Sequence, residues 1–313
     1  MTPAPAVSIR DLHMLFPVHW GRPIYALKGI DLDVPAGSVF GLLGPNGCGK
    51  TTMLSCLLGL LWPHAGEMRI GGNVVGRDRF DPRSRPYGVL LEDTRLPPFL
   101  TVGEALRTLA LLRGFEPRDA TGEVARVAER CGIQLLLARH VGVLSKGQAR
   151  RVGLAAALVG DPPLLLLDEP SSGLDVAARV EFEAMLRSLN DGRRTVVLAS
   201  HFLGDVQNTC THVAIMRDGR ILGTGRTADV VGGGEEAAAS DVYVDASAEP
   251  RLAELGLESA VSRYEGLRRV VAPLADDELL RLLLGAGVVP RRMEPRSSLL
   301  SVYLSLTAED VRE

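Results

Sequence analysis

Residues 44–52, GPNGCGKTT, are the feature that most constrains what this chain can fold into. They satisfy the pattern G-x-x-x-x-G-K-S/T, between an apolar stretch, SVFGLLG, and a helix-like stretch, KTTMLSCLLGLL. In that context the glycines let backbone N–H groups turn toward phosphate oxygens, and the helix N-terminus adds a favourable dipole. The pattern therefore predicts a strand–loop–helix unit of an α/β fold that binds a nucleotide phosphate.

The lysine of this motif is informative because the chain rarely uses lysine. Among 35 basic residues only Lys28, Lys50 and Lys146 are lysines, and Arg does not replace Lys where a compact point charge must fit. We expect Lys50 to bridge the β- and γ-phosphates and Thr51 to ligate Mg²⁺. The residues predicted to hold the nucleotide here are Gly44, Pro45, Asn46, Gly47, Cys48, Gly49, Lys50, Thr51 and Thr52.

A second motif, LLLLDE at 164–169, is an apolar strand that ends in two carboxylates. Acidic residues are common where a strand meets a loop, so this motif alone would not indicate a site. Downstream of a phosphate loop, it predicts that Asp168 reaches Mg²⁺ through a water molecule. Glu169 is then the expected general base for the attacking water.

The order of apolar runs predicts the fold around these motifs. Short strands in residues 7–43 predict an N-terminal antiparallel β subdomain, and the helical spacing after residue 100 predicts a helical insertion at about 93–150. Apolar strands then alternate with helices as far as residue 217. This alternation is typical of a mainly parallel sheet covered on both faces. We assign residues 1–229 to this α/β domain.

The remainder of the chain predicts a second, smaller domain. The segment VVGGGEEAAAS, 230–240, has the composition of a linker. Residues 241–313 show the order strand–helix–strand–strand–helix–strand, with the last strand expected at 288–293 and a closing helix at 297–307. This order predicts an α+β domain of the ferredoxin-like type.

Composition restricts the compartment and the partners. The net charge is −3, and no long basic tract indicates nucleic-acid binding. Four cysteines without C-x-x-C spacing are typical of a reducing compartment and do not indicate a zinc site. The N-terminus has no secretory signal pattern, and the apolar runs are shorter than the ~20 residues that cross a bilayer. We therefore expect a cytoplasmic chain whose membrane attachment, if any, comes from a partner.

Three further segments give the chain a family resemblance. LSKGQ at 144–148 resembles the LSGGQ signature of the ATP-binding-cassette (ABC) ATPases, and EPSSGLD at 169–175 resembles the segment from their catalytic Glu to the D-loop. His201, after the strand TVVLAS, stands at the position of the family's switch histidine. Together with the phosphate loop, these motifs occur in the family's order, and the resemblance covers about residues 7–228. It implies a P-loop NTPase of the ABC type.

The resemblance implies a mechanism that uses two nucleotide-binding domains. The domains close head-to-tail around two ATP molecules, so the start of one signature helix faces the γ-phosphate held by the other subunit. Lys50, Glu169 and His201 are then the catalytic residues, with His201 orienting the water beside Glu169. The residues expected to contact nucleotide across the interface are Ser145, Gly147, Gln148 and Asp175.

Three positions depart from the family pattern. Lys146 replaces the first glycine of the signature, and is either an exposed helix-cap residue or a contact to phosphate or ribose. Glu92 takes the place of the family's Q-loop glutamine, and is either a metal ligand or an acceptor for a metal-bound water. The aromatic residue that stacks on adenine is Phe16 or Trp20, depending on the direction of counting.

The residues therefore predict the ATPase subunit of an ABC transporter that uses ATP and Mg²⁺. The segment SSLLSVYLSLT is similar to the closing segment of ATPases from the family's exporter branch. That branch resembles drug-resistance, polysaccharide and lipid exporters. The expected partners are a second nucleotide-binding domain, in a homodimer, and an integral membrane permease that holds the chain at the inner face of the membrane. No nucleic-acid partner is expected.

Two other functions would be expected to leave different features in the sequence. A soluble ABC ATPase acting on nucleic acid or the ribosome would usually show tandem cassettes, a coiled-coil insertion, zinc clusters or basic arms. A regulatory module that binds ATP without turnover would be expected to lack Glu169 or His201.

Overall fold

A computed structural model describes residues 4–17, 23–76, 87–189, 192–232, 240–261, 266–271 and 276–295. The chain divides into two compact units, Met1–Arg226 and Thr227–Glu313. Each unit has its own hydrophobic core, and each is described by itself.

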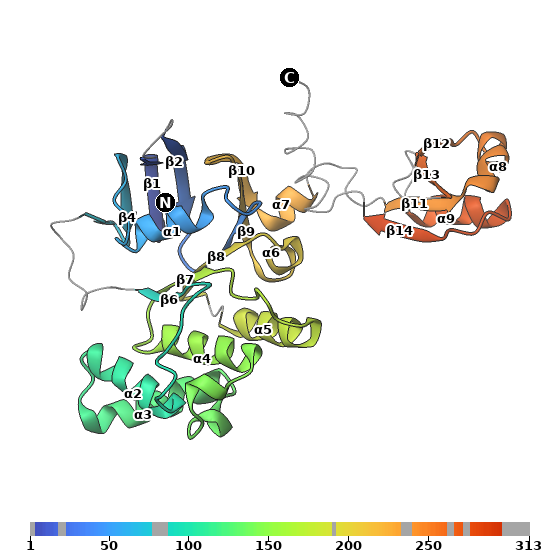
Figure 1. The fold of residues 1–313 in the computed structure, drawn as a ribbon. Helices are drawn as coiled ribbons and strands as arrows, with labels where there is room; N and C mark the ends of the chain where they lie inside the picture. The colour runs from blue at the N-terminus through green and yellow to red at the C-terminus, as the bar shows by residue number, and fades with distance from the viewer. Residues whose placement is uncertain are drawn as a thin grey trace. The chain divides into compact units, whose positions relative to one another are not determined.

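The first unit is built on a central sheet whose described strands lie in the order β10-β9-β3-β8-β7-β6 (Figure 1). Their bounds are β3 (Val39–Leu43), β6 (Tyr87–Leu90), β7 (Leu164–Asp168), β8 (Thr195–Ser200), β9 (His212–Arg217) and β10 (Arg220–Arg226). Strand β10 is antiparallel to β9, and the other neighbouring pairs are parallel. Every residue of β3, β7 and β8 is buried, because the sheet is covered on both faces. The predicted mainly parallel sheet is confirmed.

An antiparallel sheet, in the order β2-β1-β4-β5, packs against one face of the central sheet. Its strands are β1 (Val7–Phe16), β2 (Ile24–Val34), β4 (Ala65–Ile70) and β5 (Asn73–Val74). One core cluster joins the two sheets to helix α1 (Lys50–Leu57), with Ile9, Phe40, Met53 and Leu166 almost completely buried. The phosphate loop therefore starts from a rigid, doubly packed strand.

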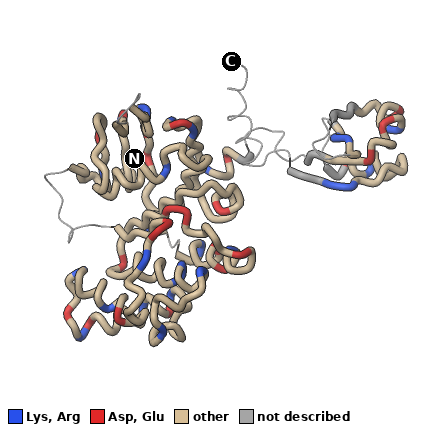
Figure 2. Tube along the Cα trace, viewed as in Figure 1, with Lys and Arg blue, Asp and Glu red and all other residues tan. Residues whose placement is uncertain are grey.

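The remaining helices of the first unit are α2 (Val102–Leu112), α3 (Pro117–Arg130), α4 (Lys146–Leu158), α5 (Val176–Ser188) and α6 (Leu203–Thr209), with short 3₁₀ turns at Gln134–Leu136 and Val141–Val143. Helices α2, α3 and α4 gather at one end of the unit (Figure 1). Acidic and basic residues are interspersed along them (Figure 2). Helix α4 lies directly on β6, since a Cβ atom built on Gly88 would come within 1.9 Å of the Ala157 carbonyl oxygen.

The second unit begins with α7 (Thr227–Gly232) and contains a four-stranded sheet in the order β12-β13-β11-β14. Its further elements are β11 (Ser240–Asp245), a 3₁₀ turn (Ala246–Ala248), α8 (Glu249–Glu254), β12 (Glu258–Val261), β13 (Leu267–Val271), α9 (Asp276–Gly285) and β14 (Arg292–Pro295). All neighbouring strands are antiparallel. This order and direction are those of a ferredoxin-like fold, as predicted, and Val242, Val270, Leu279 and Leu283 form its core.

Two expectations for the second unit differ from the structure. The last strand was expected at 288–293 but begins at Arg292, because Val288 belongs to the cap that follows α9. The Val288 amide donates to the Leu283 carbonyl at 2.8 Å, and Gly287 has a φ of 69°, which is a left-handed helix cap. The expected linker 230–240 overlaps both α7 and the first residue of β11, and the closing helix at 297–307 lies outside the described residues.

Candidate active site

The phosphate loop runs from the end of β3 to the start of α1, and two of its glycines have no room for a side chain. A Cβ atom on Gly44 would come within 2.3 Å of the Met216 carbonyl oxygen. Gly49 has a φ of 112°, and a Cβ atom there would come within 2.6 Å of the Ala26 carbonyl oxygen. The neighbouring strands β2 and β9 therefore require glycine at both positions.

Cys48 also lies in this loop and is only 3% exposed. Burial raises the pKa of its thiol, although the nearby Lys50 ammonium opposes that shift. The other three cysteines of the chain, Cys56, Cys131 and Cys210, are also free and buried.

Lys50 is the first residue of α1, and its side chain is 5% exposed. Its ammonium group donates hydrogen bonds to the carbonyl oxygens of Gly44, at 2.8 Å, and Pro45, at 3.1 Å. The same nitrogen lies 3.5 Å from Oε1 of Glu169. The structure thus brings together the lysine of the phosphate loop and the carboxylate after β7, which are 119 residues apart in the sequence.

The two acidic residues at the end of β7 have different surroundings. Asp168 is 2% exposed, and burial raises the pKa of its carboxyl, while a hydrogen bond from Thr51 opposes the shift. Glu169 is 5% exposed and has a φ of 45°. Its Oε2 atom forms a hydrogen bond with Nδ1 of His201 at 2.8 Å. A left-handed conformation is costly for a residue other than glycine, and such positions cluster at functional sites.

The oxygen atoms at this point suit a divalent cation. Asp168 Oδ1 and Glu169 Oε1 are buried without a hydrogen-bond partner among the described residues. The Lys50 ammonium, 3.5 Å away, compensates Glu169 Oε1, whereas a buried oxygen such as Asp168 Oδ1 is costly unless something compensates it. Mg²⁺ prefers oxygen ligands, and usually takes one or two from the protein and the others from phosphates and water. Thr51 and Asp168 lie close together at this point, and their oxygen atoms fit two of the three predicted magnesium contacts, the third being Glu92.

The signature segment is the exposed N-terminus of α4. Ser145 is the N-cap: its hydroxyl accepts from the Gln148 amide at 3.3 Å, and the Gln148 side chain accepts from the Ser145 amide at 3.1 Å. No hydrogen bond among the described residues connects Ser145 or Gly147 to the loop at 44–52. Asp175 caps α5 in the same way, since its side chain accepts from the Ala178 amide at 2.8 Å. Both caps are complete within one chain.

The two charged departures from the family pattern line one cavity of about 590 Å³. Glu92 accepts a hydrogen bond from the Ser172 hydroxyl at 3.3 Å. The Lys146 side chain lies beside Gly173, with its Nζ 3.6 Å from where a Cβ atom on Gly173 would be. Glu92 and Lys146 are thus both adjacent to the segment that follows Glu169.

The two candidates for adenine stacking have different positions. Phe16, at the end of β1, is partly buried against the main core. Trp20 lies outside the described residues. The adjacent Ile24, which pairs with Phe16, is 61% exposed.

Sequence reasoning missed a buried polar cluster next to His201. It consists of Asp205, Ser171 and Ser200, each at most 3% exposed, with Arg179 beside them. One signal was available in the sequence: an acidic residue on the buried face of a short helix, four residues after His201. That spacing was not used.

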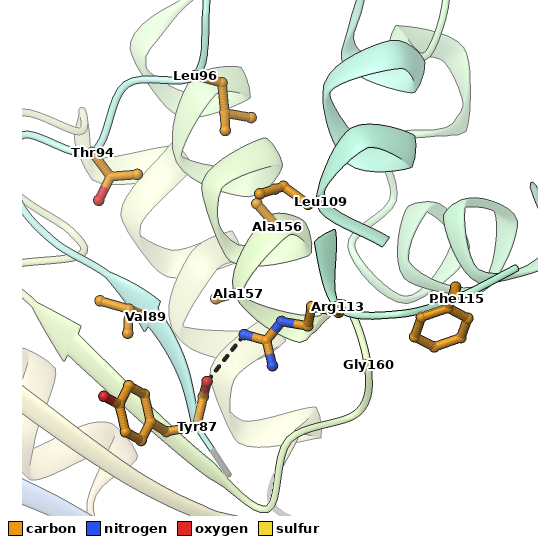
Figure 3. A pocket seen from close by; sticks show the side chains of 10 residues that line it. All are labelled: Tyr87, Val89, Thr94, Leu96, Leu109, Arg113, Phe115, Ala156, Ala157 and Gly160. Carbon is orange, nitrogen blue, oxygen red and sulfur yellow. Dashed lines mark hydrogen bonds between the residues drawn. The ribbon is translucent and has the colours of Figure 1, made fainter. Parts of the chain in front are cut away.

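A separate cavity of about 420 Å³ lies between β6, the end of α2 and the end of α4 (Figure 3). Apolar side chains, including Val89, Leu96 and Leu109, form much of its wall. Arg113 extends across it and donates a hydrogen bond to the Tyr87 carbonyl at 3.0 Å. This cavity is where the helical insertion meets the central sheet.

Comparison with known proteins decides the family. A family model described as ABC transporter matches residues 27–172. Nod factor export ATP-binding protein I of Cupriavidus metallidurans is 32% identical over 309 residues, which are 98% of this chain and 99% of that protein. This chain belongs to the ABC transporter ATP-binding family. It is accordingly an ATPase, and its family binds ATP.

Solved structures show the same fold for this ABC subunit. The ATP-binding cassette MJ0796, in a dimeric post-hydrolysis state with ADP and Pi, matches with a TM-score of 0.64 and 23% identity, over 71% of this chain and 98% of that chain. The cbiO1 protein of Clostridium perfringens, part of the ABC transporter complex cbiONQ, matches with a TM-score of 0.65 and 25% identity, over 81% and 98% of the two chains. None of the described helices of this subunit has the length and apolar character needed to cross a membrane.

Proposed function

We propose that this ABC subunit hydrolyses ATP to power export through a permease that is a separate membrane chain. The observation that carries the proposal is the contact series Lys50–Glu169–His201, with distances of 3.5 and 2.8 Å. The similarity to the Nod factor export ATP-binding protein I of Cupriavidus metallidurans supports export, because that similarity covers both units of the chain. On this proposal the subunit acts at the inner, cytoplasmic face of the membrane.

Each residue of the series has a distinct part in the proposed reaction. Lys50 binds the β- and γ-phosphates once nucleotide replaces the Gly44 and Pro45 carbonyls as its partners. Glu169 accepts a proton from the attacking water, and His201 holds that water and the γ-phosphate in position. Thr51 and Asp168 would hold Mg²⁺, which would neutralise the charge that develops on the phosphate oxygens.

The second half of the ATP site comes from another nucleotide-binding domain. Ser145 and Gly147 lie at an exposed helix N-terminus, where backbone amides and the helix dipole favour an anion. Because Ser145 already caps its own helix, its hydroxyl is fixed in direction before a partner's nucleotide arrives. We infer a homodimer in which each signature helix faces the phosphate loop of the other copy.

The contact with the permease is proposed at the helical insertion. The cavity with Arg113 lies between that insertion and β6, whose last residue, Leu90, is two positions before Glu92. A permease segment docked there would touch both the insertion and β6, which pairs with β7, the strand that ends at Asp168. Movement of the insertion would then couple transport to hydrolysis.

A matched pair of variants tests the assigned base. Glu169→Gln in the full chain should abolish steady-state ATP hydrolysis and accumulate an ATP-bound dimer. Glu129→Gln, on the exposed face of α3, makes the same chemical change away from the site and should keep normal turnover. Continued turnover by Glu169→Gln would exclude Glu169 as the base. Lys50→Ala should lose ATP binding or turnover.

A fractionation experiment tests the transporter assignment. The native subunit should sediment with membranes and co-purify with an integral membrane protein, whose identity would also indicate the substrate. Recovery with ribosomes or nucleic acid instead, and never with a membrane protein, would favour the soluble ABC ATPase.

A further inference from the structure

Asp205, on α6, connects the two loops that carry Glu169 and His201. Its Oδ2 atom accepts a hydrogen bond from the Ser171 hydroxyl and a second, at 3.1 Å, from the Ser200 hydroxyl. Ser171 is two residues after Glu169, and Ser200 immediately precedes His201. Since Asp205 is 3% exposed, water does not compete for this carboxylate. One buried oxygen atom therefore sets the distance between the two loops.

The ring of His201 is also positioned by a second set of contacts. Ser200 Oγ accepts a hydrogen bond from the Phe202 amide at 3.0 Å, which shapes the turn around His201. The Phe202 ring lies with its centroid 4.1 Å from that of His201, and the Arg179 guanidinium lies 4.0 Å from the Phe202 centroid. A cation over an aromatic face is favourable. His201 thus contacts both Glu169 and a ring that Arg179 supports.

Arg179 also extends this connection to α5. Its Nε atom and Asp205 Oδ1 are 4.0 Å apart, and both atoms are buried without a hydrogen-bond partner in the described part of the chain. Leaving a buried carboxylate oxygen unpaired is costly, so the nearby guanidinium charge compensates it. Helix α5 follows the segment 169–175, so the cluster joins that segment, α5, the end of β8 and α6.

We propose that Asp205 is a positioning residue for ATP hydrolysis, which holds Glu169 and His201 in register and contacts neither nucleotide nor the reacting atoms. This inference rests on the proposed roles of Glu169 and His201. A purely structural Asp205 would contribute to stability and leave turnover by the folded protein unchanged. A positioning Asp205 lowers kcat without weakening ATP binding, because no hydrogen bond among the described residues joins it to the phosphate loop or Lys50.

The first experiment compares Asp205→Ala and Asp205→Asn with Asp119→Ala, a control on the exposed surface of α3. Kinetic constants are measured on the full chain, together with its thermal midpoint and folded fraction. For Asp205→Ala, kcat per folded protein should fall about tenfold to a hundredfold, the effect of a small misplacement of catalytic groups, with KM for ATP nearly unchanged. Asp205→Asn should be intermediate, because its amide oxygen still accepts a hydrogen bond. A kcat equal to that of Asp119→Ala, or a parallel loss of ATP affinity, overturns the proposal.

A second set of variants retains the carboxylate. Ser171→Ala and Ser200→Ala each remove one donor, and each should lower kcat in the otherwise unaltered chain. In the Asp205→Ala background Ser171→Ala should have no further effect, because its acceptor is already gone. Ser200→Ala should still lower kcat there, because it also removes the acceptor of the Phe202 amide. Additive effects of Ser171→Ala and Asp205→Ala would overturn the proposal. Glu169→Gln is assayed in parallel: if it retains turnover, the assigned base is wrong, whereas a dead Glu169→Gln with a fully active Asp205→Ala rejects the positioning role alone.

Discussion

Replacing Ser145 with alanine separates the two roles that the start of α4 can have. As a helix cap, the Ser145 hydroxyl accepts one backbone hydrogen bond, from Gln148 at 3.3 Å. Loss of such a cap costs about 1 kcal/mol, which lowers the thermal midpoint by roughly 2–4 °C in a domain of this size. As a contact to a partner's nucleotide, the same hydroxyl would donate a charge-assisted hydrogen bond worth about 1.5–3 kcal/mol. Its loss would reduce turnover about tenfold to a hundredfold.

The chain contains a matched control for this variant. Thr101 caps α2 with the same capping box, since its hydroxyl accepts from the Glu104 amide at 3.2 Å and the Glu104 side chain accepts from the Thr101 amide at 2.8 Å. Ser145→Ala and Thr101→Ala should therefore lower the thermal midpoint by similar amounts. Only Ser145→Ala should also lower kcat and weaken the ATP-dependent dimer, measured by steady-state hydrolysis and size-exclusion chromatography. Equal turnover per folded protein in the two variants would refute the contact in trans.

Three further outcomes follow from local geometry. Gly88→Ala should strongly lower the thermal midpoint or prevent folding, because its Cβ atom would meet the Ala157 carbonyl at 1.9 Å. Gly122→Ala, in open space on α3, should instead stabilise the protein by about 0.5–1 kcal/mol in denaturant titration. Hydrogen bonds from Thr101 lower the pKa of Glu104 below its usual 4.5, so the ionised carboxylate stabilises α2 above that pH. The thermal-midpoint difference between Glu104→Ala and the unaltered chain should shrink as the pH falls below 4.5.

Much of the fold could be predicted because its signals are local. The run LLLLD is apolar until a carboxylate ends it, and β7 has those bounds. The strand expected at 288–293 was misplaced because Val288 is apolar for a different reason: it packs in the small core as part of the α9 cap. An apolar residue in the sequence indicates burial, but it does not show whether a strand, a helix or a helix cap is the buried element.

The site residues also divide into those that the sequence predicts and those that it does not. Lys50, Asp168 and Glu169 could be found because each stands at a fixed place in a short motif. The Asp205 cluster could not, because its members are separated by up to 34 residues and meet only when β8, α5 and α6 pack together. A single acidic residue on a helix has many explanations until its partners are known.

Because Cys48 is buried, the rate at which a thiol reagent labels it can report how often the phosphate loop opens. A thiol reacts as the thiolate, and burial both raises the pKa of Cys48 and shields its sulfur. A thiol reagent can therefore modify it only during the intervals in which the loop opens. The other three thiols are buried in α1, at the end of α3 and beside α6, so they should react on the slower timescale of wider unfolding. The fast phase of labelling would then give the lifetime of the closed loop, and its slowing by ATP would measure how strongly the nucleotide holds the loop shut.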